Sequence, residues 1–164
     1  MRDVETLAKE VLEACRARRM MLATAESCTG GMIAAALTDL ASASDVLERG
    51  FITYSNEAKM EMLGVAQETL ATHGAVSAET AGEMAAGALA RSRAAIAVSV
   101  TGVAGPGGGT AQKPVGLVWF GLATSDGQVR VERQLFTGPR DAVRRSSVAK
   151  ALELALEAAY AERP

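Results

Sequence analysis

A hydroxyl and a thiol lie side by side in residues 25–31, which read Ala-Glu-Ser-Cys-Thr-Gly-Gly. An apolar run before this segment predicts a buried strand, and an apolar run after it predicts a helix. Ser27 and Cys28 would then stand at a strand-to-helix turn, where unpaired helical N–H groups and the helix dipole favour a nucleophile or an anion. The structural alternative is that Ser27 caps the helix and that the glycines permit a tight turn.

A lysine follows the end of a second expected strand. Tyr54 ends an apolar run, and Lys59 lies in the first or second turn of the helix that Ser55 or Asn56 can cap. A desolvated lysine amine loses its charge more easily and can accept the proton of a serine hydroxyl. The alternatives are an exposed helical lysine and a tyrosine that only packs at the edge of the core.

Residues 101–110 are rich in glycine, which lets a backbone approach a ligand closely and aim its N–H groups at it. The segment is neither a Walker loop nor a dinucleotide fingerprint, because no helix follows it. A flexible crossover loop, closed by Lys113 and Pro114, is the alternative reading.

Arginines open the last expected helix. Arg140, Arg144 and Arg145 oppose the dipole at a helix start, which indicates a compensating anion such as a phosphate. Pairing with Asp141 or with solvent is the structural alternative. The single histidine, His73, lies between two expected helices, so we favour a structural role for it over a Cys28–His73 thiol hydrolase.

The amino-acid composition excludes several classes of function for this chain. The 164 residues suit one domain, residues 1–164, and the net charge of −2 with 4% aromatic residues argues against a nucleic-acid surface. Two cysteines and one histidine argue against a metal site, and we expect neither metal nor cofactor. The N-terminus lacks the apolar core of a signal peptide and no apolar run spans a membrane, so we expect a cytoplasmic protein without a membrane partner.

Hydrophobic periodicity alternates between strand and helix along the chain. Helices are expected over residues 4–15, 31–40, 56–63, 67–72, 78–91 and 141–161, and strands over residues 20–24, 50–54, 95–100, 115–124 and 128–136. Asp126-Gly127 predicts a hairpin between the last two strands. The fold class is therefore α/β, a three-layer α/β/α sandwich with a mixed, mostly parallel sheet of about five strands. Ligands of such sheets bind beyond the carboxyl ends of the parallel strands, where Ser27, Tyr54 and Thr101 stand.

Five segments, taken in order, resemble the CinA C-terminal domain family, and the resemblance covers nearly the whole chain. They are residues 25–31, Tyr54-Ser55-Asn56 with Lys59, residues 73–77, residues 101–109 and residues 113–116. Stand-alone members of that family are nicotinamide-nucleotide amidohydrolases. The resemblance implies hydrolysis of the carboxamide of nicotinamide mononucleotide to nicotinic acid mononucleotide and ammonia.

The same resemblance implies roles for particular residues. Ser27 is implied as the nucleophile, Lys59 as its base and Tyr54 as a hydrogen-bonding partner. The implied substrate-binding residues are Thr29, Gly30, Gly31, Thr101, Gly102, Ala104, Gly105, Arg140 and Arg144, with the phosphate on one of the two arginines. A non-catalytic nucleotide-binding module of the same fold is the alternative. We also expect a homo-oligomer, with a dimer favoured.

Overall fold

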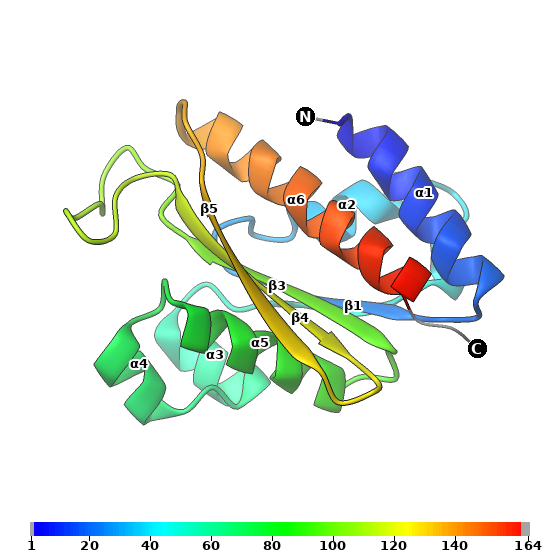
Figure 1. Ribbon diagram of the computed structural model, residues 1–164, viewed down its shortest axis with the longest axis horizontal. Coiled ribbons are helices and arrows are strands. Elements are labelled where there is room, and N and C mark those ends of the chain that lie inside the picture. The colour runs from blue at the N-terminus through cyan, green and yellow to red at the C-terminus, as the bar shows by residue number, and fades with distance from the viewer. Residues whose placement is uncertain (1, 162–164) are drawn as a thin grey trace.

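A computed structural model describes residues 2–161 as one mixed sheet between two layers of helices (Figure 1). The strand order is β2-β1-β3-β4-β5, in which β2, β1 and β3 are parallel neighbours and the β4–β5 hairpin is antiparallel. The strands are β1 (Leu22–Glu26), β2 (Leu47–Ile52), β3 (Ile96–Gly102), β4 (Leu117–Thr124) and β5 (Val129–Leu135). The expected α/β/α sandwich with a mixed sheet is confirmed, and β3 is the central strand.

Figure 1 shows α1, α2 and α6 on one face of the sheet and α3, α4 and α5 on the other. The helices are α1 (Val4–Ala17), α2 (Met32–Thr38), α3 (Asn56–Leu63), α4 (Gln67–His73), α5 (Ala78–Ala90) and α6 (Arg140–Ala161), with a 3₁₀ turn at Ala43–Asp45. Among residues 2–161, no helix has both the length and the apolar composition that crossing a membrane requires.

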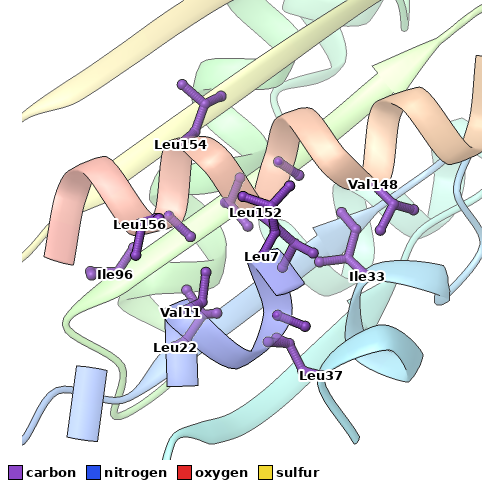
Figure 2. Packing of buried hydrophobic residues seen from close by; sticks show 14 of the residues in the cluster. Leu7, Val11, Leu22, Ile33, Leu37, Ile96, Val148, Leu152, Leu154 and Leu156 are labelled. Carbon is purple, nitrogen blue, oxygen red and sulfur yellow. The ribbon is translucent and has the colours of Figure 1, made fainter. Parts of the chain in front are cut away.

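The larger apolar core lies between the sheet and the layer of α1, α2 and α6. Leu7 and Val11 are one helical turn apart on α1 and are fully buried with Ile33 of α2 and Leu152 of α6 (Figure 2). The core under α5 is built from smaller side chains, mainly alanines. Small residues let α5 approach the sheet closely, and a Cβ at Gly121 of β4 would lie 2.2 Å from the carbonyl oxygen of Ala81.

All five strands differ from their expected bounds by one to three residues, and two of these differences concern β1 and β2. β1 continues to Glu26, beyond the expected end at residue 24, because the carboxylate of Glu26 finds hydrogen-bond donors inside the protein. β2 begins at Leu47, before the expected start at residue 50, because its charged residues Glu48 and Arg49 pair with each other in this edge strand, where the Glu48 side chain is 5% exposed. Both strands still end at the same edge of the sheet.

Substitution by alanine should affect the free energy of unfolding differently at two glycines of α5. A Cβ at Gly87 would lie 1.9 Å from the carbonyl oxygen of Leu63, so Gly87→Ala must displace the end of α3 and should lower the free energy of unfolding by about 1–3 kcal/mol. At Gly82 the nearest atom is the side-chain Cγ1 of Val131, at 3.3 Å. Gly82→Ala should therefore be neutral or stabilise by up to about 1 kcal/mol through helix propensity. Urea denaturation of both variants measures the difference, and equal effects would contradict the close packing of α3 on α5.

Candidate active site

Three segments converge beyond the carboxyl ends of β1, β2 and β3. The amide of Ser27 donates to the carbonyl of Val100 on β3 (3.0 Å), and the amide of Thr53 donates to the carbonyl of Glu26 on β1 (2.8 Å). These hydrogen bonds continue the strand pairing for one more residue on each side. Ser27 is therefore held by backbone contacts at the sheet edge where ligands of this fold class bind.

Lys59 brings its amine to Ser27. Its Nζ lies 3.0 Å from Ser27 Oγ, 2.9 Å from the Thr53 carbonyl oxygen and 3.0 Å from the Tyr54 carbonyl oxygen. Ser55 caps the start of α3 by accepting from the Ala58 amide, which fixes the helix directly after the strand. A charged ammonium has three N–H donors for these three oxygen atoms, and after losing one proton it keeps two donors for the carbonyls and gains a lone pair for the serine O–H.

Burial favours the neutral form of this amine. The Lys59 side chain is 1% exposed, and desolvation lowers its pKa below the ordinary lysine value, with a weaker opposing effect of the neighbouring Cys28 thiol. Across residues 2–161, no Asp or Glu side chain forms an ion pair with Lys59. The exposed-lysine alternative therefore does not describe this residue.

A cavity of about 280 Å³ opens in front of Ser27 and Lys59. Tyr54, 64% exposed, stands at its mouth, where the Arg140 guanidinium donates to the Tyr54 hydroxyl (3.4 Å) and to the Gly105 carbonyl (2.8 Å). Arg140 also lines a second cavity of about 650 Å³ between the glycine-rich loop and the start of α6. One arginine thus lies on the boundary between the two cavities.

The glycine-rich loop lines the cavity with the predicted Thr101, Gly102, Ala104 and Gly105. Thr101 itself is 1% exposed, and its hydroxyl donates to the carbonyl of Ala75 (2.8 Å). Sequence reasoning missed Ala75 and Val76, which line the same cavity, because neither side chain carries a reactive group.

Lys113 ties the far end of the loop to α4 by donating to the carbonyl of His73. The His73 ring lies 3.6 Å from Glu79 at the start of α5 and is not among the residues that line the cavity. These contacts fit the structural role that we favoured for this histidine.

The remaining predicted residues of the turn do not line the cavity. The Thr29 hydroxyl donates to the buried carboxylate of Glu26 (2.6 Å), and Gly30 and Gly31 adopt positive φ angles of 57° and 105°. The carboxylate of Glu26 also accepts from the amides of Ile33 and Ala34. The start of α2 therefore does hold an anion, and that anion is the protein's own Glu26 carboxylate.

Cys28 has the surroundings of a core residue. Its side chain is 6% exposed, and burial raises its pKa to about 11. A thiol with this pKa is almost wholly protonated at neutral pH, which disfavours it as the nucleophile.

Arg144 contacts the backbone of the turn. Its Nε donates to the Cys28 carbonyl (3.0 Å), and a second guanidinium nitrogen lies 3.4 Å from the Thr29 carbonyl oxygen. Arg145 instead pairs with Asp141 on its own helix. The three arginines at the start of α6 therefore have three different sets of partners.

Known proteins are similar to this chain in sequence and in fold. Residues 4–159 match the CinA C-terminal domain. Nicotinamide-nucleotide amidohydrolase PncC of Escherichia coli is 54% identical over 151 residues, which cover 92% of each chain. The crystal structure of the competence/damage inducible protein CihA from Agrobacterium tumefaciens has a TM-score of 0.92 at 50% identity, over 96% of this chain and 97% of the other. The CinA-like protein of Chloroherpeton thalassium is longer, and a match at 57% identity over 119 residues covers 28% of its length.

The state of the Cys28 thiol predicts slow alkylation. Because burial raises the pKa of Cys28 to about 11, iodoacetamide at pH 8 should modify this thiol about a hundredfold more slowly in the folded protein than in urea. Cys15, also buried with its pKa raised to about 11, is the internal control and should be similarly slow. Mass spectrometry of the labelled peptides measures both rates. Rapid, selective modification of Cys28 in the folded protein would support a thiol nucleophile instead.

Proposed function

This chain belongs to the CinA C-terminal domain family, and on that premise we propose that it hydrolyses the carboxamide of nicotinamide mononucleotide to nicotinic acid mononucleotide and ammonia. The observation that carries the proposal is the buried Lys59 amine, 3.0 Å from Ser27 Oγ. The name of the E. coli relative, a nicotinamide-nucleotide amidohydrolase, supports the choice of substrate.

The proposed reaction has two stages. Ser27 Oγ attacks the amide carbon while Lys59 takes the hydroxyl proton, and a tetrahedral oxyanion forms. Lys59 then donates that proton to the departing nitrogen, so that ammonia leaves and an ester on Ser27 remains. Water attacks this ester with Lys59 again as base, and the acid product leaves as Ser27 recovers its proton.

The turn itself offers a donor for the oxyanion. In the part of the chain that the structure describes, the amide of Cys28, which lines the cavity, donates to no protein acceptor, whereas the Gly30 amide donates to the Ser27 carbonyl. A free backbone N–H group directly after a nucleophile can stabilise the charge that develops on the carbonyl oxygen. The free Cys28 amide supports acyl transfer at this site.

The rest of the nucleotide is proposed to extend from the reaction cavity toward Arg140. The glycine-rich loop would hold the nicotinamide and ribose, with Tyr54 at the mouth. Arg140 is the proposed phosphate contact, because it lines both cavities whereas Arg144 lines only the second. A homodimer and a cytoplasmic location stay predictions from the sequence.

Ammonia release from nicotinamide mononucleotide tests the proposal directly. Ser27→Ala should lower kcat by about a thousandfold or more. Lys59→Arg should be similarly inactive, because a guanidinium cannot lose its proton in this pH range. Since Lys59 must be neutral to act, kcat/KM of the unmodified protein should rise with pH through a pKa below 10.5, the ordinary lysine value.

Cys28→Ala is the matched control for these variants and should keep most of the activity. A non-catalytic nucleotide-binding module would bind the mononucleotide and release no ammonia. Substantial activity in Lys59→Arg would exclude the lysine as base.

A second experiment tests the phosphate contact. Arg140→Ala should weaken binding of the mononucleotide by about 1.5–3 kcal/mol and leave the riboside, which lacks the phosphate, nearly unaffected. Arg145→Ala, on the same helix but paired with Asp141, is the control and should change neither substrate. Equal losses on both substrates would show that Arg140 only holds the loop through Gly105.

A further inference from the structure

Two charged side chains, the buried Glu26 and the half-buried Arg144, form hydrogen bonds with the turn that carries Ser27. We infer that Glu26 and Arg144 are positioning residues that fix this turn, residues 27–31, and thereby aim Ser27 and the backbone donor of the oxyanion. The inference rests on the proposed function only in that it concerns the same nucleophile.

Glu26 holds the donor side of the turn. Its carboxylate is 1% exposed and accepts hydrogen bonds from the Thr29 hydroxyl (2.6 Å), the Ile33 amide (2.9 Å) and the Ala34 amide (3.1 Å). All three partners are donors, so the site needs an acceptor on both oxygens. A glutamine would turn an NH₂ group toward at least one of these donors and break part of the set.

Arg144 holds the acceptor side of the turn. Its guanidinium donates to the carbonyls of Cys28 and Thr29, and it lies over Gly30, where a Cβ would be 3.5 Å from its terminal nitrogen. Because a peptide group is planar and trans, fixing the Cys28 carbonyl also fixes the plane of the peptide bond that follows Cys28. The hydrogen bond from Gly30 to the Ser27 carbonyl fixes the Cys28 amide in the same way.

Neither side chain lines the cavity in front of Ser27. Loss of Glu26 should therefore lower the rate of the chemical step while leaving the fit of the substrate nearly unchanged. Arg144 also lines the second cavity, so its loss should lower the rate of the chemical step whatever it does to the fit of the substrate. Burial and the neighbouring Cys28 thiol, and neither Glu26 nor Arg144, shift the pKa of Lys59, so the pH at which activity rises should also stay in place. A residue needed only for folding would not produce this combination.

The first experiment compares Glu26→Gln with Glu83→Gln. Glu83 accepts from one amide, that of Ala66, and one threonine hydroxyl, that of Thr69, so its variant removes the same kind of contacts far from Ser27. Covalent labelling of Ser27 by a fluorophosphonate reports its reactivity without the nucleotide. We expect Glu26→Gln to lower the labelling rate and kcat at least tenfold, with KM within twofold and an unmoved pH profile, and Glu83→Gln to change none of these.

Arg144→Met and Arg144→Lys keep the inference testable if Glu26→Gln fails to fold. Arg144→Lys, which can still reach one carbonyl, should retain more labelling and more kcat than Arg144→Met, and Arg145→Met should match the unmodified protein. If nicotinamide mononucleotide is not the substrate, the unmodified protein releases no ammonia and yet is labelled on Ser27. The labelling rates of the variants, relative to that of the unmodified protein, then still test the positioning roles. Unchanged labelling in folded Glu26→Gln or Arg144→Met would overturn the inference, as would a loss confined to KM.

Discussion

A lysine amine held out of water against a serine is the interaction on which the rest of the site depends. Keeping a lysine of ordinary pKa neutral at pH 7 costs about 5 kcal/mol, and burying it charged also costs several kcal/mol. The Lys59 position therefore opposes stability in either protonation state. The carbonyls of Thr53 and Tyr54 offset part of this cost, and they are available because α3 begins directly after β2, at the Ser55 cap.

The three layers contribute different parts of the chemistry. The sheet edge supplies the backbone position of Ser27, α3 on one face supplies the amine, and α6 on the other face supplies the arginines. Arg140 and Arg144 are one helical turn apart on α6, and yet one reaches the mouth of the cavity while the other binds the backbone under it. The nucleophile is thus held between elements that pack on opposite faces of the sheet.

The order of strands and helices along the chain predicts part of the candidate site, and contacts between distant segments determine the rest. Alternating strand and helix patterns place Ser27, Tyr54 and Thr101 at one sheet edge, because parallel strands end together. The burial of Glu26 could not be read from its type, since glutamate is normally exposed, although an acid between an apolar strand and an uncapped helix is a usable signal. Arg140 and Arg144 are four residues apart at the start of the last expected helix, and only the structure separates their roles, because Arg140 contacts Tyr54 at the cavity mouth and Arg144 contacts the turn after Ser27.

Tolerance to amino-acid change should be limited by the close contacts between layers as well as by the glycine-rich loop. At Gly87 and Gly121 an added Cβ would run into the backbone of a neighbouring element, although at Gly107 of the loop it would meet nothing within 4 Å. Gly87 and Gly121 are thus among the glycines with little freedom to vary, because they let α5 lie close to α3 and β4. In a survey of variants, these buried positions would resemble functional ones, although they lie apart from every group that could touch a substrate.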